Sequence, residues 1–312
     1  MIQKPIISIC IPTYKRSKTL KEGLDSITRQ FDGKIEKKIE IIIADDASPD
    51  DTEHMVREYM KKYDNIAYYR YPNNKGLTYN ITAVTNFAHG EYLRLFTDDD
   101  CMTDFSLKYV IEIIEKSSFD LMICNAHFGS DMQIHIDKKA NTYKTLHGIN
   151  NFVDYLFDHR RTYQQLMVYF SFYSVIVVNH KYFKDSLALQ DQDFIYQNIF
   201  PQDIIIYTQI KKDKTIIIPD NIFTIGRTLN ESYKTSMKFV TDFNVTMDMI
   251  EGANGLQGSK KWKILKRICV SGRRKTILLG FLLRWLHIDY KKNFIFKKLY
   301  EFYKKHIQNQ TA

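Results

Sequence analysis

Short, almost wholly apolar stretches alternate with amphipathic stretches over the first 125 residues, and this alternation constrains the fold most strongly. The predicted strands cover residues 6–11, 39–44, 66–70, 92–97 and 120–125. Helices are predicted between them over residues 17–30, from Asp50 and Asp51 onward, and over 78–89 and 104–117. This order predicts right-handed βαβ units and a mostly parallel sheet. Because the strands carry few polar residues, we expect both faces of the sheet to be covered.

Polar clusters follow three of these strands at the point where each strand ends. They are PTYKR (12–16), DDAS (45–48) and TDDD (97–100). The carboxyl ends of parallel strands meet at one edge of a sheet, where open α/β folds bind their ligands. We therefore expect the three clusters to converge on one crevice.

Asp98, Asp99 and Asp100 place three carboxylates side by side. Adjacent carboxylates repel one another unless a cation neutralises them, and hard oxygen ligands favour Mg²⁺ or Mn²⁺. Mg²⁺ takes only one or two protein carboxylates and completes its coordination with water and substrate phosphates. The alternative is a solvated acidic turn that caps the helix near residue 104. The neighbouring polar clusters favour a metal and diphosphate site.

The pattern weakens beyond residue 126. Residues 130–150 are predicted to form a polar loop, 169–178 a strand, 189–200 the start of a helix, and 214–227 one or two strands around Pro219. The four cysteines have no CxxC or zinc spacing, and free thiols fit a reducing cytoplasm. The N-terminal apolar run ends at Pro12 and is predicted to be a strand, not a signal peptide.

Several segments in order resemble family 2 glycosyltransferases of the GT-A fold. They are ISICIPTYKRSKTLKEGLDSITRQ, IEIIIADDASPDDT, NNKGLTYNITAVTNFAHGEYLRLFTDDD and LQDQDF, which together cover roughly residues 5–125 and the surroundings of residue 191. The resemblance implies an α/β, Rossmann-like, mostly parallel sheet. It also implies inverting transfer of a sugar from a nucleotide-diphosphate donor, usually a UDP-sugar.

The resemblance also implies roles for single residues. Those expected to line the nucleotide pocket are Pro12, Thr13, Tyr14 and Arg16. Asp46 matches the acid that hydrogen-bonds the base, usually uracil. Asp98 would lie near the ribose or donor sugar, Asp99 would ligate Mn²⁺ or Mg²⁺, and Asp100 would contact the donor sugar or support the metal site. Thr97 stands where the family commonly has a further acid. Lys75 lies in a loop expected near the donor phosphates, although an exposed turn lysine is an equal alternative.

Asp191 matches an acid that begins a helix in the family and is the candidate general base for the acceptor hydroxyl. Asp193, two residues on, competes with it for this role. The alternative is structural, because an aspartate at a helix start caps free backbone N–H groups without any catalytic part.

The C-terminal segment is strongly basic. Residues 259–312 hold fifteen lysines and arginines against Asp289 and Glu301, whereas the whole chain is only +9. The apolar run Ile277–Leu286 is too short to span a bilayer, which needs ~20 residues. Its leucines recur at helical spacing, which favours a helix lying on an anionic membrane surface. Packing against the catalytic domain is the alternative, and no nucleic-acid motif accompanies the charge.

These patterns predict a GT-A catalytic domain over residues 1–230, with a nucleotide-binding half (1–125) and an acceptor half (126–230). A helical, basic C-terminal region follows over 231–312. The expected enzyme is a cytoplasmic glycosyltransferase, peripheral at the inner face of a bacterial membrane, that acts on a lipid-linked oligosaccharide or surface polysaccharide. One alternative is a sugar nucleotidyltransferase, although the chain has no glycine-rich phosphate loop after its first strand. Another is a non-catalytic scaffold that binds nucleotide sugars.

Overall fold

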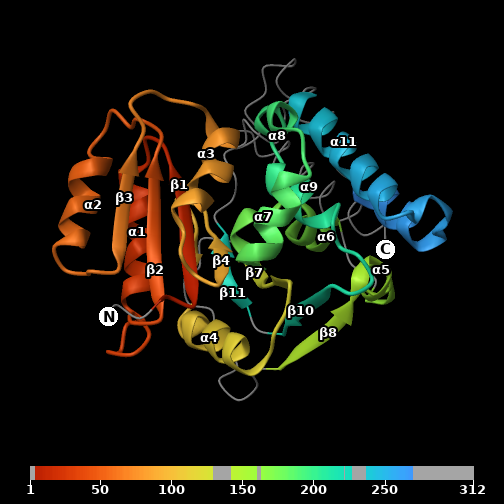
Figure 1. Ribbon diagram of the computed structural model, residues 1–312, viewed down its shortest axis with the longest axis horizontal. Coiled ribbons are helices and arrows are strands. Elements are labelled where there is room, and N and C mark those ends of the chain that lie inside the picture. Colours follow the sequence, from red (N-terminus) through yellow and green to blue (C-terminus); the bar gives the residue numbers. More distant parts are fainter. Residues whose placement is uncertain (1–3, 129–141, 160–162, 221, 227–236, 270–312) are drawn as a thin grey trace, which may run out of the picture.

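The centre of the protein is an eight-stranded sheet (Figure 1). The computed structural model describes residues 4–128, 142–159, 163–220, 222–226 and 237–269. The strand order is β3-β2-β1-β4-β9-β6-β10-β8. The bounds in chain order are β1 (Ile7–Thr13), β2 (Ile39–Asp45), β3 (Ile66–Arg70), β4 (Tyr92–Leu95), β6 (Leu121–Ile123), β8 (Tyr143–His147), β9 (Ile176–Asn179) and β10 (Thr215–Pro219). Only β8 and β9 run against the other strands of this sheet, so the expected mostly parallel sheet is confirmed.

A small second sheet lies beside the acid cluster. It consists of β5 (Cys101–Met102), β11 (Ile222–Gly226) and β7 (Asn125–Phe128), with β11 in the middle. β11 pairs antiparallel with β5 and parallel with β7. Since β5 begins directly after Asp100, this pairing fixes the chain on the far side of the three aspartates.

Helices surround the large sheet. Their bounds are α1 (Ser17–Thr28), α2 (Thr52–Met60), α3 (Leu77–Ala83), α4 (Ser106–Lys116), α5 (Gly148–Asp158), α6 (Tyr163–Ser171), α7 (His180–Ala188), α8 (Gln192–Gln197), α9 (Pro201–Tyr207) and α11 (Met237–Ala253), with 3-10 turns η1 (Val84–Phe87), η2 (Tyr173–Val175) and η3 (Leu256–Gly258). α1 buries Leu20, Leu24 and Ile27, the three residues at helical spacing in its sequence. Every residue of β1 is buried, as expected for a strand covered on both faces.

The structure corrects two expectations for the second half of the chain. Strand β8 and the start of α5 lie within residues 130–150, where a polar loop was predicted. β8 is an edge strand whose side chains are exposed or only partly buried, so its sequence looks like a loop. Residues 169–171 end helix α6, and the strand predicted over 169–178 begins only at Ile176. A buried apolar run does not distinguish a helix from a strand by periodicity.

Residues 237–269 pack against the preceding part of the chain. Helix α11 contacts α9 at the right of Figure 1, and residues 260–269 are also helical. Trp262 is fully buried, with its ring centroid 6.0 Å from that of Phe170. Lys261 pairs with Asp154 and Asp158 at 3.0 and 3.3 Å. The leucine run within 277–286 lies outside the described residues.

All four cysteines are buried free thiols, as expected. Within the described part of the chain, none of the helices has the length and apolar character that a bilayer span requires.

Candidate active site

The three polar clusters meet at the carboxyl ends of β1, β2 and β4. Thr13 Oγ1, at the end of β1, donates a hydrogen bond to Asp98 Oδ2 over 2.8 Å. The backbone N–H of Lys15 donates to Ser48 Oγ over 2.8 Å, and that of Asp46 donates to the Thr13 carbonyl over 3.0 Å. The parallel register of β1 with both neighbours places these strand ends side by side.

Arg16 is the cation at the centre of the cluster. Its Nη1 lies 3.0 Å from Asp98 Oδ1 and 2.7 Å from Asp99 Oδ2. The Asp98 side chain is only 8% exposed, whereas those of Asp99 and Arg16 are 27% and 38% exposed. Asp99 is therefore the member of this ion-paired set that presents a carboxylate to an incoming ligand, with Arg16 beside it.

Burial raises the pKa of Asp98 from 3.8 to about 6. The charge of Arg16 acts in the opposite direction and favours the carboxylate, while the neighbouring Asp99 charge raises the pKa further. Thr13 and Arg16 also stabilise the ionised form by hydrogen bonds. The site thus keeps a buried carboxylate at neutral pH by surrounding it with donors and one cation.

Asp100 is turned into the protein. It is 3% exposed, and its Oδ2 accepts a 2.6 Å hydrogen bond from Thr97 Oγ1. The Thr97 backbone N–H in turn donates to Ser174 Oγ over 2.9 Å. Ser174 comes from η2 and was not found by sequence reasoning, because a single serine in an apolar run carries no signal.

Asp46 holds the loop that precedes α3. Its side chain accepts hydrogen bonds from the backbone N–H groups of Lys75 and Gly76, at 2.6 and 2.9 Å. Gly76 has φ of 91°, a conformation that glycine adopts without strain. The Lys75 side chain is exposed. Asn80, within α3, is buried and donates to the Ala44 carbonyl, which ties the same helix to β2.

Two residues without glycine's freedom adopt positive φ where the strands end. Lys15 follows β1 with φ of 56°, and Ala47 follows β2 with φ of 62°. Such conformations persist when surrounding contacts fix them, and they cluster at functional sites. Nearby, the fully buried Asp45 bonds the Tyr68 hydroxyl at 2.5 Å and the Ser48 backbone N–H at 2.9 Å. Asp45 therefore shapes the turn, and we expect no contact with a ligand.

Asp191 is the N-cap of α8. Its Oδ1 accepts a 2.9 Å hydrogen bond from the Phe194 backbone N–H, and the residue is exposed. Asp193 lies in the first turn of the same helix and is also exposed. α8 packs against α3, where the Tyr79 and Tyr196 ring centroids lie 5.1 Å apart. The candidate base is thus on a helix that packs against α3, next to the loop held by Asp46. The hydrogen bond that its side chain accepts comes from α8 itself.

The donor set at Asp98 and Asp99 suits a hard divalent cation, since it consists of carboxylate oxygens at a strand end. Within the described residues, no group of three His, Cys, Asp or Glu side chains is arranged to hold a metal ion by itself. A cation bound here would therefore depend on ligands from a diphosphate or water, as Mg²⁺ sites commonly do.

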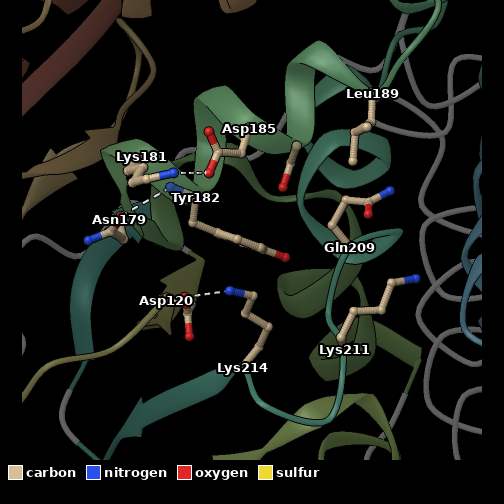
Figure 2. A pocket seen from close by; sticks show the side chains of 10 residues that line it. Asp120, Asn179, Lys181, Tyr182, Asp185, Leu189, Gln209, Lys211 and Lys214 are labelled. Carbon is tan, nitrogen blue, oxygen red and sulfur yellow. Dashed lines mark hydrogen bonds and ion pairs between the residues drawn. The ribbon is translucent and has the colours of Figure 1, made fainter.

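A separate pocket of about 340 Å³ lies at the other end of the strands from the three polar clusters. It is found where β6 and β10 begin and β9 ends (Figure 2). Two of its three lysines pair with its two aspartates, whereas Lys211 bonds the backbone carbonyls of Thr208 and Ala253. Lys214 lies 3.3 Å from Asp120, and Lys181 lies 2.5 Å from Asp185. This pocket therefore offers no strong net charge to a ligand.

Comparison with models of known protein families gives a match that covers more than half of the chain. The family described as Glycosyl transferase family 2 matches residues 8–187. Abequosyltransferase RfbV from Salmonella typhimurium is 37% identical over 121 residues, which is 38% of this chain and 35% of that protein. The matches to the first curated relatives span only 35% to 38% of those proteins.

A longer match is to GalNAc(5)-diNAcBac-PP-undecaprenol beta-1,3-glucosyltransferase from Campylobacter jejuni. It is 27% identical over 274 residues, 86% of this chain and 80% of that protein. The structure of S. aureus TarS in complex with UDP has a TM-score of 0.57 at 18% identity, over 92% of this chain and 74% of that one. Mannosyltransferase PcManGT from Pyrobaculum calidifontis, in complex with GDP-Man and Mn²⁺, has a TM-score of 0.57 at 12% identity, over 88% and 72%. These likenesses confirm the GT-A fold.

Proposed function

The chain belongs to glycosyl transferase family 2, and from this premise we propose that it is an inverting, metal-dependent transferase. It moves a sugar from a nucleotide-diphosphate donor, in the first place a UDP-sugar, to a hydroxyl of a glycan acceptor. The observation that carries the proposal is the meeting of three strand-end clusters around the partly exposed Asp99 and Arg16.

The donor binds along the edge formed by β1, β2 and β4. The residues assigned to its nucleotide are Pro12, Thr13, Tyr14 and Asp46. Arg16 is within reach of the diphosphate, and the guanidinium group suits phosphate oxygens because it donates parallel hydrogen bonds. Asp98 and Asp100 orient the donor side of the site through their buried hydrogen bonds. The exposed Lys75 side chain, on the loop held by Asp46, is assigned to the donor phosphates.

Asp99 would hold Mn²⁺ or Mg²⁺, which would supply Lewis-acid stabilisation of the negative charge that develops on the leaving nucleoside diphosphate. The chain's own residues do the rest of the chemistry. The acceptor hydroxyl attacks the anomeric carbon from the face opposite the diphosphate, so the configuration inverts. Asp191 takes the hydroxyl proton as general base, with Asp193 as the competing residue on the same helix turn.

The acceptor is proposed to be a lipid-linked oligosaccharide or surface polysaccharide. The Campylobacter relative, whose name refers to an undecaprenol-linked glycan, supports this choice by its match over most of both chains. The basic segment 259–312 would hold the enzyme on the cytoplasmic face of an anionic membrane. We accordingly assign catalysis to residues 1–230, with the acceptor bound by 126–230, and membrane contact to 231–312. Residues 237–269 pack against the first part and hold the two together.

The test is nucleoside-diphosphate release across a panel of nucleotide sugars, with a bacterial lipid extract as acceptor. We expect UDP release that requires the extract and stops with EDTA. Asp99→Asn is expected to lower kcat at least about a hundredfold, because one preorganised charge-stabilising group contributes this much. Asp104→Asn, a nearby exposed acid paired with Arg29, is the matched control and should keep full activity. Pyrophosphate release, or activity unaffected by EDTA, would contradict the proposal.

A further inference from the structure

Arg16 contacts Asp99, the carboxylate proposed to hold the metal ion. Its Nη1 lies 2.7 Å from Asp99 Oδ2 and 3.0 Å from Asp98 Oδ1, so one nitrogen bridges both carboxylates. The residue is the N-cap of α1, one position before the helix starts, and β1 ends three residues earlier at Thr13. Its backbone is thus held by two regular elements while its side chain remains 38% exposed and able to move.

A divalent ion held by Asp99 would meet the guanidinium group of Arg16, which already bonds one oxygen of that carboxylate. Mg²⁺ binds carboxylate oxygens at about 2.0–2.1 Å and tolerates little distortion of its geometry. An ion at that distance from Asp99 would lie within a few ångströms of Arg16 Nη1, and the two positive charges would repel each other. Without another anion, the two aspartates carry two negative charges and Arg16 already neutralises one of them.

A nucleoside diphosphate removes this conflict. Its phosphate oxygens add negative charge beside Asp99, and they give Arg16 acceptors that match the guanidinium fork. Arg16 could then exchange Asp99 for a phosphate, and Asp99 would become available to hold the metal ion. Binding of the ion and binding of the nucleotide are thereby linked, and such linkage is reciprocal.

We propose that Arg16 is a built-in counter-ion of Asp99 that makes divalent-ion binding depend on the nucleoside diphosphate. The inference rests on the proposed function, because it takes Asp99 as the metal ligand. It adds that the free enzyme binds the metal ion weakly because Arg16 is paired with Asp99. Metal binding becomes stronger when Arg16 exchanges this carboxylate for a phosphate of the nucleotide.

The test measures Mn²⁺ affinity of the full-length protein by electron paramagnetic resonance of the free ion, with and without saturating UDP. For the wild type we expect weak binding of Mn²⁺ alone and much tighter binding with UDP. Arg16→Gln should bind Mn²⁺ alone about tenfold more tightly than the wild type, since a charge repulsion at close range is removed. The factor by which UDP raises Mn²⁺ affinity should shrink accordingly.

Two further variants separate the effect of the Arg16 charge from the effects of losing any nearby charge or of replacing the Arg16 side chain. Lys18→Gln removes one exposed positive charge two residues away and should leave Mn²⁺ affinity at the wild-type value. Arg16→Lys keeps the charge and should also stay close to the wild type with Mn²⁺ alone, while it loses part of the UDP effect. Should Arg16→Gln be unstable, the reduced UDP effect of Arg16→Lys still tests the proposal, and an unchanged UDP effect in that variant would contradict it.

The possible failures are distinguishable. Equal Mn²⁺ affinity of Arg16→Gln and wild type in the absence of UDP, with the UDP effect intact in both, overturns the counter-ion role and leaves the proposed function in place. Absence of Mn²⁺ binding to the wild type even with UDP contradicts the metal role of Asp99, and this inference with it.

Discussion

At the scale of one residue, the buried Asp98 carboxylate lowers the stability of the fold, although its partners keep it ionised for a role in the site. Its carboxyl group is buried at the end of β4 and its pKa is raised to about 6, chiefly by that burial. Thr13 and Arg16 reduce this penalty through hydrogen bonds and charge. A buried ionised group of this kind serves a ligand better than it serves stability.

The sign of the pH effect follows from the raised pKa. Between the ordinary value of 3.8 and about 6, the folded protein binds more protons at Asp98 than the unfolded chain does. The contribution of Asp98 to the free energy of unfolding therefore falls as pH rises through this window. We expect Asp98→Asn to be more stable than the wild type at pH 7.5 by about 1–2 kcal/mol, with a difference that shrinks towards pH 4.

Thermal unfolding of both proteins at several pH values measures this difference, and calorimetry with UDP should show weakened binding by Asp98→Asn. Asp104→Asn is again the control, because its side chain is 67% exposed. If the stability difference stays constant between pH 4 and 7.5, the destabilisation does not come from the ionised Asp98 carboxylate, and the prediction is wrong.

At the scale of elements, α8 combines a capping role and a proposed catalytic role in one residue. Asp191 caps the helix by accepting the Phe194 N–H, and α8 packs on α3, which carries the loop bound by Asp46. A simple Asp191→Ala variant would lose the cap and the carboxylate together. Asparagine separates the two roles, because it is as good an N-cap as aspartate and is not a base.

Asp191→Asn is therefore expected to melt like the wild type and to lose at least about a hundredfold in kcat, the low end of what general-base catalysis contributes. Asp191→Ala should lose the same activity and also about 1 kcal/mol of stability. Asp193→Asn is the matched variant in the same helix turn. If Asp193→Asn is inactive and Asp191→Asn active, the base is Asp193.

At the scale of the whole molecule, the basic C-terminal segment is not a simple appendage. Within it, Trp262, Leu265 and Cys269 are buried, and they recur at helical spacing on the helix formed by residues 260–269. On the other side of that helix, Lys260, Lys263 and Arg267 are exposed. Truncating a buried tryptophan to alanine costs about 3–5 kcal/mol, so a cut before residue 260 would destabilise the catalytic fold itself.

Membrane binding is therefore best tested by a cut after residue 269. The shortened protein should keep its melting temperature and UDP affinity, and it should no longer float with vesicles that contain phosphatidylglycerol. The full-length protein should float with these vesicles, less so at high salt, because its lysines and arginines attract anionic lipids. Equal flotation of the two proteins at low salt would contradict a membrane role for residues 270–312.

The elements of residues 6–125 and the meeting of the three polar clusters could be predicted from the sequence alone. Each predicted strand and helix of residues 6–125 is present, because local apolar patterns decide buried parallel strands and the helices that cover them. The clusters at 12–16, 45–48 and 97–100 met as expected, since parallel strands end at one edge.

The partners of these side chains could not be predicted from the sequence, because they lie far away along the chain. The Arg16 bridge, the Ser174 contact and the loop held by Asp46 all join residues distant in sequence, and no local pattern encodes such pairings. The same holds for β8 and α6, whose conformations depend on the neighbours they pack against. Local sequence sets what a segment can form, whereas contacts between distant segments set what its polar groups do.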